Sequence, residues 1–428
     1  MDLSCIPDGR RGLKKKGPIR IGVVGVGRGQ SLAGNIGDLT GTRLVAICDT
    51  WEERLDEVGK RLGVATFTDY EKFLSFDMDA VILANYFHQH APFAIKALEA
   101  GFHVMSETSA CKTLAEGVAL CRAVEKSKRI YMFAENYPYN AANQQMSRLY
   151  REGEIGRVLY AEGEYNHPMS VDRYLRLAPG CGHWRNTMPS TYYCTHALAP
   201  LMTATDEMPV SVNALSIPDE EYRKESVVQG DRGSVILVRT DGGAVFRLFQ
   251  TFLPGHSVWY RIHGTHGLVE HVRGSGYWGP GLLRVVHEEW DRKPGVATER
   301  TFVAEFPELA DKAAAAGHGG GDFFVAWHFA EAIRSGRQPY LDVYRGVSMS
   351  AVGILAWKSA LAGGAPFSMP DFRREADRRK HAKDRWSPFP EDAGPGQPPS
   401  SVHGPHRPTA KALARARRVW KENGYDGV

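Results

Sequence analysis

A chain of 428 residues exceeds what a single hydrophobic core usually fills, so we expect two domains and an additional terminal segment. Hydrophobic residues make up 43% and charged residues 24% of the chain, which excludes disordered and fibrous proteins. The formal charge of +4 comes largely from basic terminal segments, and this pattern argues against a nucleic-acid-binding face.

Cysteine usage and hydropathy indicate the compartment. The six cysteines form no CxxC pair and no zinc-type Cys/His spacing, so we expect reduced, mostly buried thiols. The sequence contains no apolar run of about 18 residues, the length that a membrane span requires. Its polar N-terminus through Lys16 is unlike a secretory signal. We therefore expect a cytoplasmic protein without a membrane or nucleic-acid partner.

The first third of the chain alternates apolar runs with segments of helical spacing. This alternation predicts a parallel, doubly wound sheet of the Rossmann type. The predicted strands lie at 19–28, 42–48, 65–67, 79–84, 103–105 and 130–133. One predicted helix ends at 62, and three others span 70–74, 90–101 and 114–126.

The pattern changes after a predicted helix at about 141–152. Apolar residues then alternate with polar ones at 235–239, 244–252 and 259–263, and Asp241-Gly242-Gly243 is typical of a hairpin turn. These runs predict a mostly antiparallel sheet that is open on one face. Helical spacing resumes at 323–335 and 344–361.

The C-terminal tail has too few apolar residues to predict a core of its own. It is charged after Arg373, rich in Pro, Gly and Ser over 387–408, and ends in a basic helix at 410–423. The tail is therefore either an arm that wraps a partner subunit or a flexible end. We expect a homo-oligomer, a dimer or tetramer, formed through the open sheet and this arm. The predicted units are a basic arm at 1–17, a Rossmann domain at 18–140, an α+β domain at 141–375 and the tail at 376–428.

A glycine-rich turn follows the first strand. Gly25 and Gly27 supply the tight bend and the close backbone approach that a pyrophosphate needs, whereas Gly29 stands one place before the usual third glycine. Asp49 ends the next strand, 24 residues after Gly25, where a carboxylate binds ribose hydroxyls and repels a 2′-phosphate. This spacing favours NAD over NADP. The alternative for Asp49 is a helix N-cap.

Residues 81–113 resemble the Gfo/Idh/MocA oxidoreductases. A strand ends in a small-residue turn, His90 precedes the next helix, and Glu107-Thr108-Ser109 stands where that family has Glu-Lys-Pro. The resemblance extends over most of residues 18–372 and implies an NAD-binding domain. The turn, the aspartate and the resemblance together predict cofactor contacts from Gly25, Gly27, Arg28, Gly29, Asp49, Asn85, His88, His90, Glu107, Thr108, Asn136 and Trp184.

One departure from the family pattern changes the expected chemistry. The lysine that polarises the reacting hydroxyl in sugar dehydrogenases of this family is replaced by Thr108, which cannot carry a positive charge. Further motifs resemble the branch called glycoside hydrolase family 109, which also lacks that lysine. They are Glu135-Asn136, Gly163-Glu164-Tyr165, Trp184-Arg185-Asn186, Tyr193-Cys194-Thr195-His196 and Gly317-His318-Gly319-Gly320-Gly321-Asp322.

This resemblance implies a glycosidase that oxidises a ring hydroxyl at C3 transiently, eliminates the anomeric group, adds water and reduces the product again without consuming NAD. Tyr193 and His196 are the predicted acid/base pair, because the two residues share one face if a helix begins there. The alternative for His196 is a hydrogen-bonded core histidine.

Substrate contacts are predicted for Tyr165, His183, Arg185 and His318. Two of these residues have a structural alternative to substrate binding: Arg185 could form an ion pair, and His318 could fix a loop. Asp322 is a candidate N-cap of the helix that follows. The spacing of His183, His196 and His318 fits no metal motif, so we predict no metal.

Two other functions stay open. One is an ordinary NAD-dependent sugar or cyclitol dehydrogenase in which His196 or Tyr193 replaces the lysine, and the other is a non-catalytic sugar or dinucleotide sensor. N-acetylgalactosaminides are the substrates that the resemblance implies, while Arg173, Arg176, His183 and Arg185 also suit an acidic sugar such as sulfoquinovose.

Overall fold

The computed structural model describes residues 17–37, 40–274, 281–292, 294–314 and 316–425. The basic arm predicted at 1–17 therefore lies outside the described residues except for Gly17.

The first sheet has six strands in the order β3-β2-β1-β4-β5-β6, and every neighbouring pair is parallel. The strand order reverses at β1, so the carboxyl ends of β1 and β4 border the crevice in which such sheets bind ligands. The predicted Rossmann sheet is confirmed. Its strands are β1 (Ile19–Val24), β2 (Thr42–Cys48), β3 (Ala65–Phe67), β4 (Ala80–Leu83), β5 (His103–Ser106) and β6 (Tyr131–Phe133).

Local sequence signals explain where the helices of this sheet begin and end. Asp69 and Thr113 cap α3 and α5 through their side-chain oxygens, and Gly63 ends α2 in the left-handed conformation. The helical segments are α1 (Gly29–Ala33), α2 (Glu52–Leu62), α3 (Tyr70–Leu74), η1 (Phe87–Gln89), α4 (His90–Glu99) and α5 (Leu114–Ser127).

The second sheet has nine strands in the order β14-β13-β12-β11-β7-β10-β9-β8-β15. Only the central pair β7 and β10 is parallel within this described sheet, so the predicted mostly antiparallel sheet is confirmed. The predicted hairpin joins β9 to β10, and Gly243 takes the left-handed conformation that the turn requires. The strands are β7 (Val158–Asn166), β8 (Pro209–Ile217), β9 (Gly233–Thr240), β10 (Val245–Thr251), β11 (Ser257–Gly264), β12 (Gly267–His271), β13 (Leu282–Val286), β14 (Glu299–Val303) and β15 (Phe367–Ser368).

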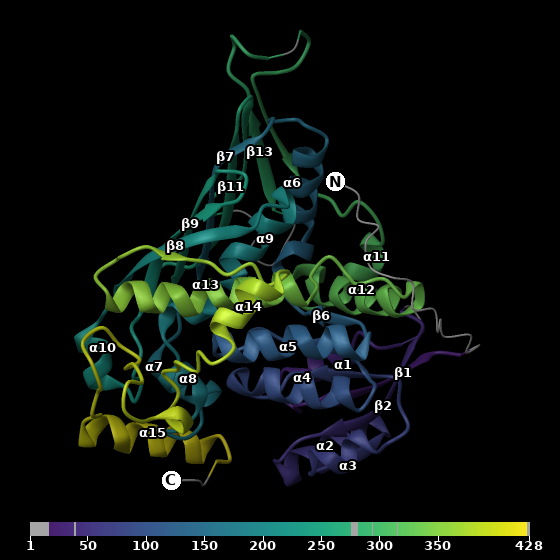
Figure 1. The fold of residues 1–428 in the computed structure, drawn as a ribbon, viewed down its shortest axis with the longest axis vertical. Helices are drawn as coiled ribbons and strands as arrows, with labels where there is room; N and C mark the ends of the chain where they lie inside the picture. Colours follow the sequence, from purple (N-terminus) through teal and green to yellow (C-terminus); the bar gives the residue numbers. More distant parts are fainter. Residues whose placement is uncertain (1–16, 38–39, 275–280, 293, 315, 426–428) are drawn as a thin grey trace.

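Helices α6, α9 and α13 cover one face of this sheet, and α13 runs with α12 between the second sheet and the Rossmann helices α4 and α5 (Figure 1). Gly163 on β7 lets α9 come close, because a Cβ there would lie 1.9 Å from the carbonyl oxygen of Ala197. The helical segments after β6 are η2 (Tyr137–Tyr139), α6 (Ala141–Arg151), α7 (Val171–Leu177), α8 (Trp184–Thr187), η3 (Ser190–Tyr193), α9 (Thr195–Thr205), α10 (Glu220–Glu225), α11 (Ala310–Ala313), η4 (His318–Gly320), α12 (Gly321–Ser335), α13 (Val343–Leu361), α14 (Glu375–His381), η5 (Pro390–Asp392) and α15 (Ala410–Glu422).

The opposite face of the second sheet carries a ladder of ion pairs. Glu162 and Glu164 flank Gly163 and therefore point away from α9. Arg247 bridges both carboxylates, and Arg261 and Arg273 each pair with one of them. This face is polar where the helix-covered face is apolar.

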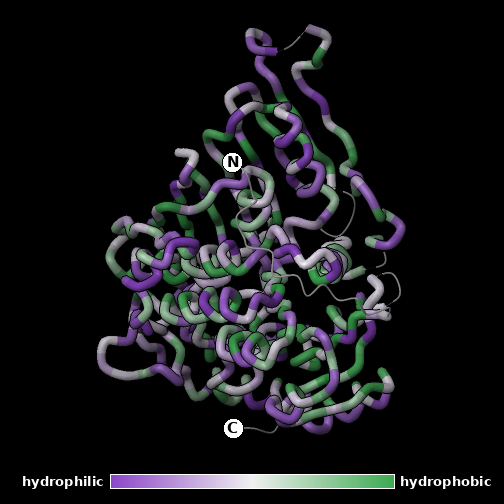
Figure 2. The backbone as a smooth tube through the Cα atoms, turned by 45° about the vertical axis from the view of Figure 1, so that its right-hand side comes forward, coloured by the Kyte–Doolittle hydropathy of each residue, from purple (hydrophilic) through white to green (hydrophobic). Residues whose placement is uncertain are grey.

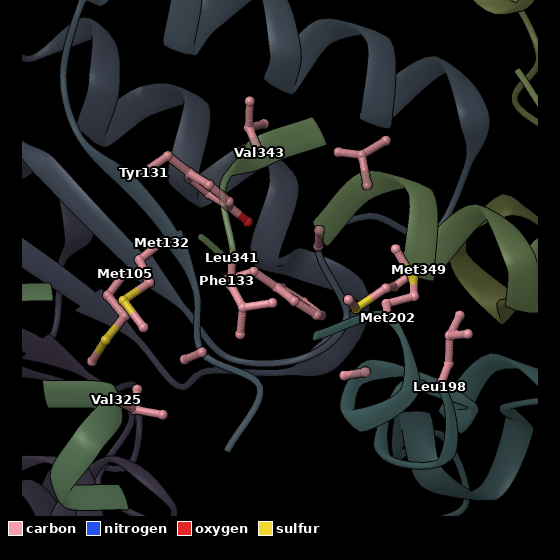
Figure 3. Close-up of a cluster of buried hydrophobic side chains, with 14 of the residues drawn as sticks. Met105, Tyr131, Met132, Phe133, Leu198, Met202, Val325, Leu341, Val343 and Met349 are labelled. Atoms are coloured by element: carbon pink, nitrogen blue, oxygen red, sulfur yellow. The ribbon is translucent and has the colours of Figure 1, made fainter. Parts of the chain in front are cut away.

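One hydrophobic core joins the two sheets. Met105 and Phe133 of the Rossmann strands lie in the same cluster as Met202 of α9, Val325 of α12 and Met349 of α13 (Figure 3). The shared helices therefore hold the two sheets in one relative position.

The tail packs against its own chain. Ala416, Val419 and Trp420 of α15 are buried together with Leu175 of α7 and Val227. The Trp420 Nε1–H also donates to the carbonyl of Leu175 over 3.1 Å. The predicted basic helix is therefore confirmed, and the alternative of a flexible end is wrong.

No helix among the described residues is both long and apolar enough to span a membrane. The trace in Figure 2 agrees, because hydrophilic and hydrophobic residues alternate along its elements.

We predict that Trp420→Ala destabilises the protein by about 3–5 kcal/mol, the usual cost of truncating a buried tryptophan. The Trp420 side chain is 2% exposed, whereas Trp290 is 84% exposed, which makes Trp290→Ala the matched control. Chemical denaturation measures both variants. Equal unfolding free energies for the two would contradict the docking of α15.

Candidate functional site

The three glycines after β1 have different physical roles. Gly25 has φ +99°, and a Cβ on it would lie 2.4 Å from the carbonyl oxygen of Ala84, so the turns after β1 and β4 touch here. A Cβ on Gly27 would meet no atom within 4 Å, which leaves the backbone open to a ligand. A Cβ on Gly29 would lie 2.9 Å from Val23, so this early glycine serves the close helix–strand packing that the third glycine usually serves.

Asp49 lies beside this turn. Its Oδ2 accepts a hydrogen bond from the Val26 backbone N–H (2.7 Å), and its Oδ1 accepts one from Trp51 N–H (2.9 Å). The N-cap of α2 is Trp51, so the N-cap alternative for Asp49 is wrong. The carboxylate is positioned at the end of β2, where it suits ribose hydroxyls.

The loop after β4 contains buried polar atoms that lack hydrogen-bond partners. Both amide atoms of Asn85 and the Nδ1 atom of His88 are buried without a hydrogen-bond partner. Such atoms are rare in folded proteins, and a bound polar cofactor would supply their partners. His90 differs, because its two nitrogens lie 2.9 Å from the Ser109 carbonyl and 3.2 Å from the Asn85 carbonyl. His90 therefore holds the loops together.

Arg28 is enclosed by carboxylates. Its Nε lies 2.6 Å from Glu107, and its two terminal nitrogens lie 2.8 and 2.7 Å from Asp322. Asp322 also accepts hydrogen bonds from Asn136 (2.9 Å) and His318 (3.0 Å). Burial opposes ionisation of Asp322, but Arg28 and His318 hold its pKa well below the usual range.

This network changes three expectations. The N-cap of α12 is Gly320, so the predicted N-cap role of Asp322 is wrong. His318 makes the loop-fixing contact that its alternative required. The guanidinium of Arg28 is already held by two carboxylates, so it shapes the turn through them.

His196 lies at the centre of an aromatic group. Its ring centroid lies 4.5 Å from that of Tyr137, 4.7 Å from Tyr165 and 4.9 Å from Tyr193. Its Nδ1 donates to Glu135 Oε1 over 2.7 Å. Glu135 is fully buried, and its Oε2 has no partner among the described residues. The carboxylate thereby orients the imidazole ring through its Nδ1 atom.

Two local features bring this group together. Tyr193 ends η3 and His196 lies in the first turn of α9, so the two rings meet across a junction and do not share one α-helix face. The Tyr260 hydroxyl donates to the His196 carbonyl over 2.6 Å and ties α9 to β11. Burial raises the pKa of the Tyr193 phenol, while Arg185 lowers it.

The residues around α8 form the next part of the site. The Arg185 guanidinium lies over Trp184 at 4.3 Å and 6.0 Å from the Tyr193 ring centroid. No carboxylate of the described chain pairs with Arg185, so its structural ion-pair alternative has no support. His183 caps α8 by accepting from the Arg185 N–H, and burial with the Arg185 charge lowers its pKa to about 3. Arg173 and Arg176 are exposed on α7.

A cavity of about 520 Å³ adjoins this group. Asn136, Tyr137 and His318 line it from the site, and Val258 and Phe306 add apolar surface. Its volume lies within the range of small-molecule pockets. Within the described ranges, no three His, Cys, Asp or Glu side chains gather as a metal site would require.

Glu135 belongs to a motif that the sequence shares with family 109, but the sequence predicts no role for its side chain. The signal was an acidic residue directly after a buried strand, at the carboxyl edge of the sheet. Its partner is 61 residues away, so only the fold reveals the pair.

Family comparisons agree with this geometry. Residues 19–135 match the oxidoreductase family with an NAD-binding Rossmann fold, and residues 143–270 match the GFO/IDH/MocA C-terminal domain. Residues 210–378 match the glycosyl hydrolase 109 C-terminal domain. A glycosyl hydrolase family 109 protein of Solibacter usitatus is 30% identical over 399 residues, which cover 84% of this chain and 90% of the relative. The chain belongs to the Gfo/Idh/MocA oxidoreductases, in the glycosyl hydrolase family 109 branch.

Other relatives of this family 109 protein carry more specific names. An alpha-N-acetylgalactosaminidase of Shewanella oneidensis is 25% identical and covers 85% of this chain and 87% of the relative. Levoglucosan dehydrogenase in complex with NADH and L-sorbose superposes with a TM-score of 0.70 at 21% identity, covering 83% of this chain and 100% of that one. An Agrobacterium radiobacter oxidoreductase in complex with NAD⁺ has a TM-score of 0.67 at 18% identity and covers 82% and 98%. These structures share the fold of the family 109 protein, and the match of residues 19–135 to the NAD-binding Rossmann family identifies its first sheet as an NAD-binding one.

We predict that Asp322→Asn destabilises the protein by about 3 kcal/mol, because it removes the fully buried carboxylate of the network and leaves the partly buried Arg28 with Glu107 as its remaining charged partner. Denaturant unfolding and NAD titration by calorimetry measure the effect, and we expect weaker NAD binding as well. Glu221→Gln, which breaks an exposed ion pair with Lys224, is the control and should change stability little. The importance of the network is contradicted if the two variants unfold alike.

We also predict a stability loss in acid that depends on His183. The unfolded chain protonates this residue near pH 6.5 and the folded chain only near pH 3, so stability present above pH 6.5 falls as the pH drops. The expected loss is about 2 kcal/mol between pH 6.5 and pH 5. His183→Asn, which keeps a capping oxygen, should reduce this loss, whereas the exposed His266→Asn should not. Unfolding free energies at both pH values give the answer, and an unchanged pH dependence in His183→Asn contradicts it.

Proposed function

We propose that this chain is an NAD-dependent glycoside hydrolase that leaves its cofactor unchanged. In the proposed reaction the sugar C3 hydroxyl is oxidised transiently, the neighbouring C2 loses a proton and the aglycone leaves. Water then adds at the anomeric carbon, and C3 is reduced again. Bound NAD supplies a reversible hydride acceptor, and the turn at Gly25–Gly29, Asp49 and Asn85 fit such a group.

The paired His196 and Glu135 carry the proposal. A neutral imidazole with Nδ1–H on a carboxylate accepts a proton at Nε2, and the carboxylate stabilises the resulting cation. Tyr193, 4.9 Å away between ring centroids, supplies a phenol for proton donation. A cycle that removes and returns protons needs groups that transfer them in both directions, and this pair suits it.

The replacement of the family lysine supports hydrolysis over simple dehydrogenation. Thr108 is buried two residues beyond the end of β5 and brings no charge. The ammonium of Lys112, four residues later, lies 2.9 Å from Glu391 and 2.7 Å from Asp392, so its charge is already compensated. Proton transfer from O3 therefore falls to His196 or Tyr193.

The substrate groups have candidates as well. Arg185 offers a guanidinium that no described carboxylate occupies, and Tyr165 packs against His196. The adjoining cavity has room for a sugar or its leaving group. These features support a glycoside, and Arg185 leaves open whether it is an N-acetylgalactosaminide or an acidic sugar.

Two properties of the whole protein stay predictions. We propose a cytoplasmic homo-oligomer that associates through the open face of the second sheet. The docked position of α15 removes most of the support for the tail as the contacting arm.

The decisive experiment incubates purified protein with a panel of aryl glycosides without added NAD. Aglycone release at a constant rate over many turnovers per bound NAD supports the proposed hydrolase. Net NADH formation from free sugar and added NAD supports the dehydrogenase instead. Binding of NAD or sugar with neither reaction supports the sensor.

Variants of the acid/base group test the residues. We predict that His196→Ala and Tyr193→Phe each lower turnover at least about a hundredfold while NAD still binds. Glu135→Gln should lower it at least about tenfold by removing the charge that supports the imidazolium. Glu221→Gln, an exposed change, is the control. Full activity in both His196→Ala and Tyr193→Phe would overturn the assignment.

A further inference from the structure

The segment at 384–403, named the strap here, connects α14 to α15 and lies beyond the family matches, which end at residue 378. It contacts both the Rossmann part and the part of the molecule that contains the second sheet. The carbonyl of Asp384 accepts from the Ala115 backbone N–H in the Rossmann part (2.9 Å). In the second part, the Trp357 Nε1–H donates to the Pro399 carbonyl (3.0 Å), and the Val402 N–H donates to Asp231 (3.2 Å). The strap therefore holds the two parts together.

Phe389 of the strap lies directly behind the wall of the site. Its side chain is 1% exposed. Its ring centroid lies 5.4 Å from that of His88, 5.9 Å from Tyr192 and 6.4 Å from Phe87. Phe87 in turn stacks on Trp184 at 5.0 Å and on Tyr193 at 6.2 Å. Phe389 thus supports a wall made of residues from both parts.

The charged residues that follow Phe389 hold the same loop. Glu391 Oε1 lies 3.3 Å from His88 Nε2 and 2.9 Å from the Lys112 ammonium. Asp392 lies 2.7 Å from the same ammonium, which is itself largely buried. His88 Nε2 therefore lies within ion-pair distance of a strap carboxylate, and the His88 ring also stacks on Phe389.

The supported loop is one border of the dinucleotide crevice. It follows β4, and its first residue touches Gly25 of the turn after β1. Asn85, whose amide atoms lack partners, belongs to it. Phe87 and His88 of η1 pack against Phe389, and Glu391 lies 3.3 Å from His88, so a displacement of η1 away from these residues would break all three contacts.

We infer that the strap retains the cofactor: Phe389 and Glu391 are positioning residues that hold the loop at 84–90 closed over NAD and slow its dissociation. This inference rests on NAD binding and is independent of the proposed hydrolysis.

The test measures how fast bound NAD leaves. The full chain is loaded with fluorescent etheno-NAD, mixed with excess NAD, and followed by the change in fluorescence. We expect exchange at least about tenfold faster in Phe389→Ala and about threefold faster in Glu391→Gln, with Phe389→Leu restoring most of the slow rate. Pro395→Ala, an exposed change in the same strap, should exchange like the parent protein.

The thermal unfolding of each variant without NAD separates retention from folding. A purely structural role would lower the unfolding temperature and leave the exchange rate of the folded protein unchanged. If Phe389→Ala does not fold, Glu391→Gln still decides the question. Exchange equal to that of Pro395→Ala in the folded variants overturns the inference, whatever the outcome with glycosides.

Discussion

The site depends on the ion pair that the buried carboxylate of Asp322 forms with Arg28. The carboxylate binds Arg28, 294 residues earlier, together with Asn136 and His318. A buried charge is stable only with its partners, so this contact defines one position of the glycine turn relative to α12. Because α12 shares its core with α13 and the Rossmann strands, the crevice and the second sheet keep a single relative geometry. The proposed acid/base group of His196 and Tyr193 therefore keeps one position relative to the glycine turn.

The features that sequence predicted correctly are those with local causes. The β2 strand is bounded by polar residues and reads as one apolar run, so its limits at Thr42 and Cys48 were correct. The hairpin at Asp241-Gly242-Gly243 follows from turn chemistry alone. Helix α13 follows from its periodicity. The family motifs brought Tyr193 and His196 into the candidate site, although neither spacing nor propensity revealed the junction that joins η3 to α9.

The features that sequence could not predict are those with distant partners. Glu135 is recognisable in the sequence only as an acidic residue. It becomes the partner of His196 because α9 brings His196 Nδ1 to 2.7 Å from Glu135 Oε1. Arg28 was predicted as a cofactor contact from its place in the glycine turn. Its carboxylate partners Glu107 and Asp322 lie far away in the sequence, so no local pattern reveals that they enclose its guanidinium. The tail is polar on average, yet Ala416, Val419 and Trp420 recur at helical spacing and form one apolar stripe. That stripe was the available signal for docking, and average composition concealed it.

The rings of the site form a continuous series from the cavity to the strap. Tyr137 borders the cavity and packs on His196, His196 packs on Tyr193, and Tyr193 packs on Phe87, behind which lies Phe389. The proposed reaction stores a hydride on its cofactor and later returns it, so the cofactor has to remain bound while water enters and the aglycone leaves. The cavity at one end of the series has room for small molecules, and the strap at the other end contacts the loop at 84–90. The His196 and Glu135 pair, which we propose exchanges protons with the substrate, lies between these two ends.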